Sequence, residues 1–479
     1  MPPSVATDAP TERSPLMLHD GVSIAASDRS DDKVALALRN PDDYASTATE
    51  LKELLQLAYP VVLTTALEFL PGFTSTIQAG HLQSPFTKEY VDAATLSTMF
   101  TNITGYSIGF GLASALDTLC SQAFGAKRLD KIGVYFQSGL IIIGACLIPI
   151  GFINWYSGDF LLLMGQDAGI AEYSQIYSRW NLIGVPFVFL YELQRKALQA
   201  QGIMTPLVGI AVMGNVVQIL AGYWLAYYTS WGFAGVALSR SLGNMALPLM
   251  LWLYFKHKPE HLSQWWSGWD LRAAAEHVGL FLRLGLPGML MLVMEWWAFE
   301  IMSLMAGLLP DPVVAMSAHS VVLNIVSLLY IVFLGSSAVR VLVTKLAVAL
   351  GLALGLAAFF ARHWIPLLFV NDPVAVESAA RVLVFWTPFE ISEGVNGVMQ
   401  GIFRGSGMQD MAARINMVTF YLFGMPLAYV LAFRAHWSVE GLWFGMGLSL
   451  TLSAALLTHK SSRWDWRALA DAAKRRTAE

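Results

Sequence analysis

Charged residues and cysteines are both scarce in this sequence. Asp, Glu, Lys and Arg make up 13% of its 479 residues, about half the fraction usual in soluble domains. The formal net charge is −4, so no basic field indicates a nucleic-acid partner. The two cysteines, Cys120 and Cys146, lie in or beside apolar runs, and no Cys/His cluster has metal-ligand spacing. These features argue against nucleic-acid binding, a disulfide framework and a metal site.

Sequence motifs of the common enzyme classes are also missing. The string GFGLASA at residues 109–115 is rich in small residues, but it lacks the lysine and the strand context of a phosphate-binding loop. No nucleophile elbow and no nucleotide-binding domain occur. We therefore expect a protein that is not an enzyme and that holds no cofactor.

Long apolar runs are abundant. Hydrophobic residues make up 56% of the chain, and several runs exceed the length of about 18 residues that suggests a membrane span. The pattern predicts an all-α polytopic membrane protein with twelve transmembrane helices. Their expected ranges are 54–79, 93–119, 132–156, 174–193, 206–229 and 232–255 in the first half, and 281–308, 313–339, 343–363, 378–402, 413–433 and 438–459 in the second.

Polar segments divide the chain into five parts. Residues 1–50 are polar without an apolar stretch, and we interpret them as a disordered tail rather than a signal peptide. Two six-helix lobes are expected at residues 51–255 and 281–460. The linker at 256–280 carries a Trp cluster typical of an amphipathic segment at the membrane interface. The last part, residues 461–479, is a short basic tail.

The distribution of Lys and Arg predicts the orientation in the membrane. The connections that follow helices 2, 4, 6, 8 and 10 hold most of these residues, whereas the alternate connections hold few: Lys88, Arg362, Arg381 and Arg434. By the positive-inside rule, both termini are cytoplasmic.

The two sets of helices resemble repeats of one unit. Pro60 is followed eight residues later by Glu68, and Pro287 is followed eight residues later by Glu295, an offset of 227. An even number of helices in each half gives both halves the same orientation in the membrane. The repeat is therefore parallel, with two lobes around a central cleft.

One segment of the repeat is missing from the second half. The offset between equivalent positions falls by 17 residues between helices 8 and 10, and the first-half counterpart is the turn at residues 120–137. Helix 8 is expected to end near Val339 and helix 9 to begin by Val343. So short a link joins close antiparallel neighbours or requires a shortened helix 9.

Helix 7 carries two carboxylates inside an apolar span. Residues 284–307 include Glu295 and Glu300 with a Trp pair between them. A charge near the bilayer centre costs roughly 2.5–3.5 kcal/mol on insertion scales, so such residues usually face a bundle interior or an aqueous cavity. Residues five apart lie about 140° apart around a helix. One of the two is expected to line a pathway while the other pairs with a neighbouring helix; the alternative is that both are structural.

Other polar residues within the spans allow two interpretations. Glu68 occupies the repeat-equivalent position of Glu295 and is a candidate proton carrier or a structural hydrogen-bond partner. Glu390 and Glu393 share one face of helix 10, and Glu393 is the stronger functional candidate. We interpret Asp117 as a cap or an interface residue and His319 as a satisfied core histidine.

Several stretches resemble the multidrug and toxic compound extrusion (MATE) transporters, in their eukaryotic branch. The matching strings are AGHL (79–82), GFGLASALDTLCSQAFGAK (109–127), LQAQGIMTP (198–206), LPGMLMLVMEWWAFE (286–300) and GIFRGSGMQ (401–409). They cover roughly residues 50–460 in the order found in the family.

The resemblance implies a twelve-helix, two-lobed exporter. Its implied coupling residues are the helix-7 glutamates Glu295 and Glu300 and the helix-10 acid Glu393. The residues expected to line the cleft are Trp296, Asn102 and Asn324. Asn324 stands where the animal members have a helix-8 glutamate, which would alter selectivity. The family's Gly-rich turn after helix 8 is missing.

Three classes of function fit a protein of this kind. The first is a secondary antiporter that exports organic cations, drugs or other amphiphiles in exchange for protons or sodium. The second is a flippase for lipid-linked substrates, which is expected to line its cleft with Arg and Lys. The third, a membrane enzyme, has no motif to support it. The acidic spans favour the first class. We expect a monomer in the plasma membrane or in a vacuolar or other organelle membrane, with the lipid bilayer and a small organic cation as its partners.

Overall fold

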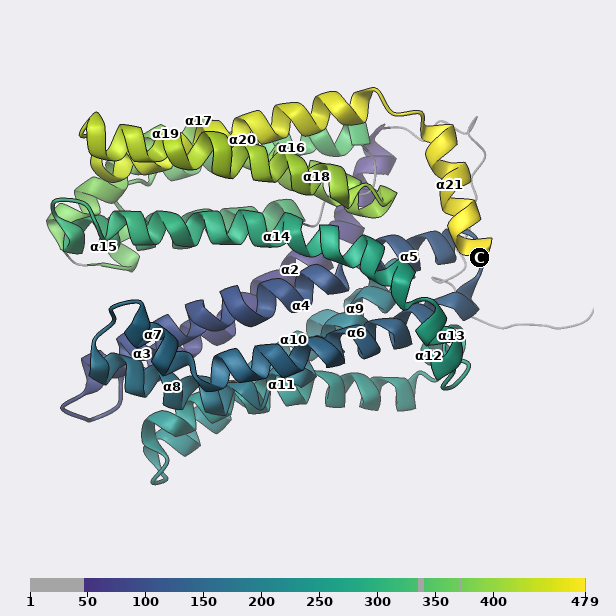
Figure 1. Ribbon diagram of the computed structural model, residues 1–479, viewed down its shortest axis with the longest axis horizontal. Helices are drawn as coiled ribbons and strands as arrows, with labels where there is room; N and C mark the ends of the chain where they lie inside the picture. Colours follow the sequence, from purple (N-terminus) through teal and green to yellow (C-terminus); the bar gives the residue numbers. More distant parts are fainter. Residues whose placement is uncertain (1–46, 335–339, 371, 479) are drawn as a thin grey trace, which may run out of the picture. The chain divides into compact units, whose positions relative to one another are not determined.

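The computed structural model describes residues 47–334, 340–370 and 372–478, and every regular element in these ranges is helical. Figure 1 shows long helices that run side by side. Six helices among the described residues are individually long and apolar enough to cross a membrane, and two shorter apolar helices are Val314–Ser327 and Ala347–Phe360. The all-α architecture predicted from the sequence is confirmed.

The first half contains six helical rods, two of them interrupted. The elements are α2 (Thr47–Gly80), α3 (Thr87–Thr101), the π-helix η1 (Asn102–Tyr106), α4 (Ser107–Ala113), α5 (Ala115–Gly125), α6 (Leu129–Trp155), α7 (Ser157–Leu163), α8 (Ala168–Leu182), α9 (Val185–Ala200), α10 (Thr205–Tyr227) and α11 (Gly232–His257). The segments α3 to α5 form the second rod, and α8 with α9 forms the fourth.

The second half follows two short linker helices, α12 (Glu260–Ser263) and α13 (Leu271–Glu276). Its elements are α14 (Val278–Ala306), α15 (Pro312–Leu334), α16 (Arg340–Phe360), the short 3-10 turn η2 (Pro366–Leu368), α17 (Pro373–Ser406), α18 (Gln409–Asn416), the π-helix η3 (Met417–Gly424), α19 (Met425–Tyr429), the π-helix η4 (Val430–Arg434) and α20 (Ser438–Ser462). The last helix is α21 (Trp466–Ala478).

The rods agree in number and order with the twelve predicted helices, but some are longer than predicted. The fourth, predicted at 174–193, extends from residue 168 to residue 200, and the tenth, predicted at 378–402, is α17 at 373–406. Their ends carry polar residues, so a hydropathy pattern that detects the apolar centre of a span underestimates its length.

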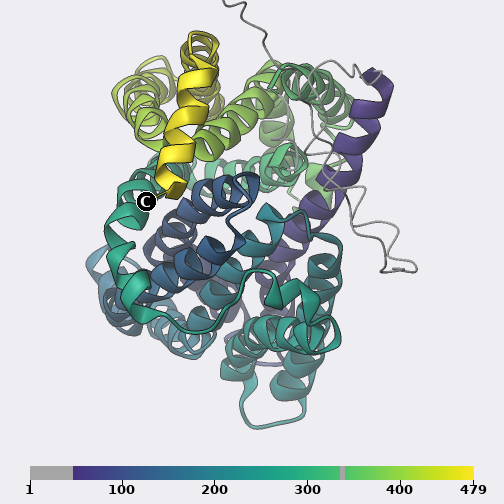
Figure 2. The same ribbon diagram turned by 90° about the vertical axis from the view of Figure 1, so that its right-hand side faces the viewer.

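Helix 7 belongs to both halves. At its start, Phe281 and Leu284 lie in the largest hydrophobic cluster of the first half. Further along α14, Ala298 and Met302 lie in a cluster formed by the second half. Figure 2 shows the ribbon of Figure 1 turned by 90° about the vertical axis. The start of α14 therefore packs against the core of the first half, and its later turns pack against the core of the second half.

Small residues allow α4 and α14 to approach closely. A Cβ atom on Gly111 would lie 2.5 Å from the Cα atom of Met289, and one on Gly288 would lie 2.1 Å from the Ser114 hydroxyl oxygen. Both separations are too short for a side chain. Small residues at helix crossings are typical of membrane bundles, where close packing replaces the hydrophobic effect as the source of association.

The second half has no described counterpart of α5. The link between α15 and α16, residues 335–339, lies outside the described residues, and so does the predicted end of helix 8 near Val339. Helix 9 begins at Arg340, three residues before the predicted Val343. In the first half the equivalent region holds α5 and a turn that leads into α6 at Leu129.

Candidate functional site

Three carboxylates of the second half are buried together. Glu295 on α14 is 6% exposed, and Glu390 and Glu393 on α17 are 0% and 4% exposed. Glu390 and Glu393 are three residues apart and lie on the same side of α17. Glu393 is close enough to both Glu390 and Glu295 to interact with them electrostatically. The three acids therefore form one site between two helices.

The hydrogen-bond partners of these acids are neutral. Gln400 donates from its Nε2 atom to the Glu295 Oε2 atom at 2.9 Å, and Trp386 donates from Nε1 to the Glu390 Oε2 atom at 2.9 Å. The other oxygen of Glu390 and the Oε2 atom of Glu393 are buried without a hydrogen-bond partner among the described residues. Arg404 acts on Glu295 only as a more distant charge. Within the described ranges no ion pair neutralises the three carboxylates.

Adjacent residues of α14 face different parts of the molecule. Glu295 points to α17, where it binds Gln400. Trp296 is half-buried against the main hydrophobic cluster of the first half. Glu300 is also half-buried, and its Oε2 atom has no described hydrogen-bond partner. Among the described residues, Glu295 and Glu300 share no hydrogen-bond partner. Trp296 lies where the two halves meet.

The two asparagines predicted to line the cleft are both half-buried. Asn102 is the first residue of η1, the π-helical turn within the second rod. Single π-helical turns are frequent at functional sites because they displace side chains from the regular helical positions. Asn324 lies on α15 in the second half. Their role in lining a cleft stays a prediction.

Glu68 lies in a network of charges in the first half. Its Oε1 atom is 3.4 Å from the Nη1 atom of Arg195. Arg195 also binds Glu192 through Nη2 at 2.5 Å and through Nε at 2.9 Å. Lys196 is 3.5 Å from Glu192 and donates to the Asp117 Oδ1 atom at 2.8 Å. Glu68 is therefore paired with a cation from α9, unlike the acids of the second half.

This network continues into the second half. The Oδ2 atom of Asp117 is 4.0 Å from the Nε atom of Arg404 at the end of α17. Asp117, predicted to be a cap or an interface residue, instead joins the two halves. One signal was present: the string YELQRK places Glu192, Arg195 and Lys196 three and four residues apart, on one face of α9. Nothing in the sequence indicated that Arg404 would join them.

His319 on α15 is a core histidine with a hydrogen-bond partner. It is 1% exposed, and its Nε2 atom lies 2.8 Å from the hydroxyl oxygen of Ser303 on α14. Its ring packs against Trp443 with ring centroids 5.4 Å apart. These contacts hold α14, α15 and α20 together and agree with the structural interpretation.

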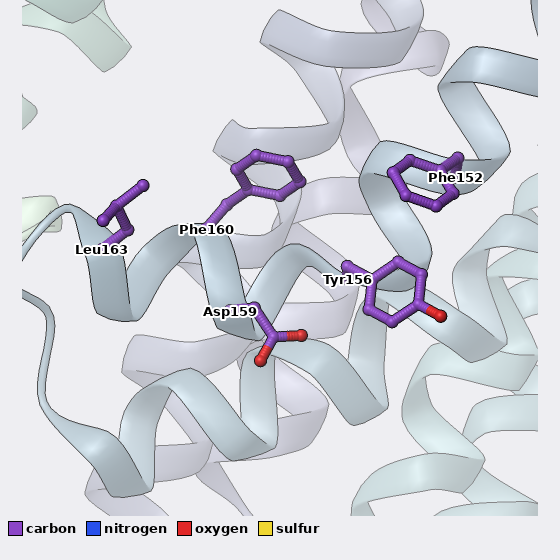
Figure 3. Close-up of a pocket in the computed structure, with 5 residues that line it drawn as sticks. All are labelled: Phe152, Tyr156, Asp159, Phe160 and Leu163. Atoms are coloured by element: carbon purple, nitrogen blue, oxygen red, sulfur yellow. The ribbon is translucent and has the colours of Figure 1, made fainter.

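A surface pocket lies away from these acids. Figure 3 shows its lining residues at the end of α6 and on α7: Phe152, Tyr156, Asp159, Phe160 and Leu163. Asp159 accepts a hydrogen bond from Gln175 at 3.2 Å. None of the predicted site residues lines this pocket. Aromatic side chains at helix ends are typical of the membrane interface.

Twelve helical rods among the described residues, in two like halves, with buried acids on α14 and α17 of the second half, define the class of polytopic membrane transporters. Comparisons with known proteins support this class and identify the family. The MatE family model matches residues 60–224 and 337–430. Multidrug and toxin extrusion protein 1 of Oryctolagus cuniculus is 33% identical over 440 residues, which cover 87% of this chain and 76% of that protein. Multidrug and toxin extrusion protein 2 of Mus musculus is 32% identical over 445 residues, covering 89% and 76%. The chain belongs to the MATE family.

Solved structures share the fold. The eukaryotic MATE transporter AtDTX14 superposes with a TM-score of 0.84 at 27% identity, covering 90% of this chain and 99% of that chain. A transporter of the MOP superfamily from Pyrococcus furiosus has a TM-score of 0.73 at 15% identity, with 88% and 96% covered. The predicted fold, twelve transmembrane helices in two six-helix lobes, is confirmed, and the protein is an integral multi-pass membrane protein.

Proposed function

We propose that this protein is a secondary active antiporter that exports organic cations and related amphiphiles in exchange for protons by alternating access. The site for both ligands is the acid cluster of Glu295, Glu390 and Glu393, with Trp296 at its side. The family and the named relatives support multidrug and toxin extrusion in general. The choice of cations as cargo and of protons as coupling ion rests on the chemistry of the cluster.

The observation that carries the proposal is a group of buried carboxylates with neutral hydrogen-bond partners. Like charges in an apolar site repel one another, so the cluster is stable only when a proton or another cation neutralises part of its charge. A proton and an organic cation therefore compete for the same carboxylates, and this competition produces exchange. The Trp296 ring, on the side of α14 that packs against the first half, supplies an aromatic surface that attracts a flat cation.

Two of the other predicted site residues take different roles in this proposal. Glu68 is paired with Arg195, so it positions the first half rather than binding cargo. Glu300 lies about 1.4 helical turns beyond Glu295 and extends the negative field along α14. An ion gradient supplies the energy, and no cofactor takes part. The working unit is a monomer in the plasma membrane or an organelle membrane, which fluorescence imaging of a tagged protein would distinguish.

A flippase for lipid-linked anions is the alternative. Anionic headgroups require Arg or Lys in the binding site, because a phosphate next to three carboxylates would be repelled. The described neighbours that hydrogen-bond to Glu295 and Glu390 are an amide and an indole. This chemistry favours cationic cargo.

Reconstitution into liposomes tests the proposal. An imposed pH gradient should drive uptake of a fluorescent organic cation, and an imposed sodium gradient of the same size should not. Glu295→Gln keeps the shape of the side chain and removes its charge, and we expect it to reduce proton-driven exchange to the background level. Glu377→Gln is a matched control, because the Glu377 side chain is 54% exposed. Near-normal exchange by a folded Glu295→Gln variant would refute the proposal.

A further inference from the structure

The end of α17 is held by α5, an element of the other half. The Thr118 hydroxyl on α5 donates to the backbone oxygen of Arg404 and accepts a hydrogen bond from Gln409 Nε2 at 3.0 Å. Gln122, one turn further along α5, donates to the backbone oxygen of Gly405 at 3.4 Å. The last carbonyl groups of a helix have no partner within that helix. Side chains of α5 therefore provide part of the C-terminal cap of α17.

The C-terminal helix α21 also contacts the end of α17. Arg476 donates from its Nη2 atom to the backbone oxygen of Ser406 at 3.4 Å, and a Cβ atom on Gly407 would lie 2.2 Å from the Arg476 Nη1 atom. Gly407 ends α17 in the left-handed conformation with φ 77°. Before α21 begins, Trp464 packs on Phe403 with ring centroids 4.5 Å apart. Trp464 and α21, which follow α20 in the chain, thus both pack against the end of α17.

The helix α21 also packs against α5. Figures 1 and 2 both show α21 at the end of the bundle beside α5. A cation at the C-terminal end of a helix is favourable because the helix dipole places negative charge there. One helix therefore contacts α5 of the first half and the end of α17 of the second half at the same point.

The ion pair between Asp117 and Arg404 lies at the same place, where α5 meets the end of α17. It is the one ion pair that joins the two halves among the residues that the structure describes. By the positive-inside rule this end of the molecule faces the cytoplasm. Contacts across the two halves at this end must separate when the protein opens towards the cytoplasm.

The two halves of the repeat differ at this end, because the second half lacks the segment that follows helix 8. This difference explains why α21 packs here. In a symmetric pair, the helix and turn after helix 8 would lie opposite α5. The second half lacks that segment, as the fall of 17 residues in the repeat offset shows. α21 supplies a helix beside α5 from a different part of the chain.

We propose that α21 (Trp466–Ala478), here called the strap, holds the cytoplasmic end closed in place of the missing segment. Arg476 binds the strap to Ser406 and Gly407 at the end of α17. The proposal rests on the proposed alternating-access transport. Opening towards the cytoplasm requires the strap to leave either α5 or the end of α17. The contact is suited to release, because the hydrogen bond from Arg476 Nη2 to the backbone oxygen of Ser406 is long, at 3.4 Å.

Two spin labels can report this closure without any transport measurement. Gly125 on α5 and Gly405 on α17 are both exposed, and a Cβ atom at either position has no neighbour within 4 Å. The labelled cysteines are placed there in the full chain after Cys120→Ala and Cys146→Ala. The distance between the labels, measured by pulsed electron paramagnetic resonance, separates closed from open populations.

Arg476→Ala should raise the ratio of open to closed molecules about three- to tenfold, the effect of losing one ordinary hydrogen bond. Removal of residues 466–479 should raise it at least as much. Arg475→Ala is the matched control, because Arg475 is an exposed neighbour on the same helix, and it should leave the distances unchanged.

Unchanged distances in both the Arg476→Ala and the truncated protein would overturn the strap, and so would an equal change in the Arg475→Ala control. Because the readout is a distance, a failure of proton-driven exchange with a normal response of the labels would count against the proposed function alone.

Discussion

Arg195 is predicted to be the residue whose loss destabilises the first half most strongly. Its side chain is 12% exposed and that of Glu192 is 5% exposed, and the two are joined by two hydrogen bonds. Removing one partner of a buried ion pair costs about 3–5 kcal/mol when the remaining charge is uncompensated; here Lys196, 3.5 Å from Glu192, compensates part of it, so the lower end of this range is expected. Arg195→Ala should therefore lower the free energy of unfolding by about this amount.

The contributions of the Glu68–Arg195 and Glu192–Arg195 ion pairs to the free energy of unfolding can be measured separately. The Glu68 side chain is 30% exposed, so solvent screens its pairing with Arg195 and Glu68→Gln should cost about 1 kcal/mol or less. In the double variant Glu192→Ala/Arg195→Ala both buried charges are removed. We expect it to be more stable than Arg195→Ala alone, with a coupling energy of about 2 kcal/mol or more.

Thermal unfolding of the purified protein in detergent is the assay. For a chain of this length a loss of 4 kcal/mol corresponds to a fall in the midpoint of roughly 5 °C. Glu68→Gln should unfold within about 1 °C of the parent protein. If the double variant is as unstable as the sum of the two single variants, the charges do not act as a pair and the reasoning fails.

Three further predictions concern packing and the site. Gly111→Leu should destabilise the protein by about 1–3 kcal/mol, because a Cβ atom there already meets the backbone of Met289. Gly125→Leu is the control, because a Cβ atom at Gly125 has no neighbour within 4 Å. Equal midpoints of thermal unfolding for the two variants would contradict this prediction. Gln400→Ala removes the residue that donates a hydrogen bond to Glu295. Because the carboxylate then lacks its donor, the pH dependence of exchange should change clearly while the midpoint of thermal unfolding changes little. An unchanged pH profile would count against the site. Inserting residues 125–137, GAKRLDKIGVYFQ, after Arg340 should raise stability or cation efflux by restoring the missing turn, and equal values in both proteins would show that the shorter link is tolerated.

Hydropathy alone predicted the membrane spans because the bilayer requires each span to be long, apolar and helical. The offset of 227 between Pro60–Glu68 and Pro287–Glu295 predicted two like halves. The helical angle between Glu295 and Glu300 predicted that one partner could not serve both. These conclusions depend on spacing along the chain, and spacing is visible in the sequence.

The interruptions of the rods were not predicted. The break at Ser114 and the π-helical turns η1, η3 and η4 lie inside continuous apolar runs. A hydropathy average does not change when one backbone hydrogen bond shifts to a different carbonyl group. Such breaks depend on how neighbouring helices pack, as at the close contact of α4 with α14.

Only the tertiary structure decided which partner each charge has. Glu295 binds Gln400, which is 105 residues away in the chain, whereas Glu68 at the equivalent position of the first half binds Arg195. The two glutamates are alike in the sequence repeat, yet one has a neutral partner and the other a cation. The physical reason is that the cost of a buried carboxylate depends on the charges within a few ångströms, and helices far apart in sequence bring those charges together.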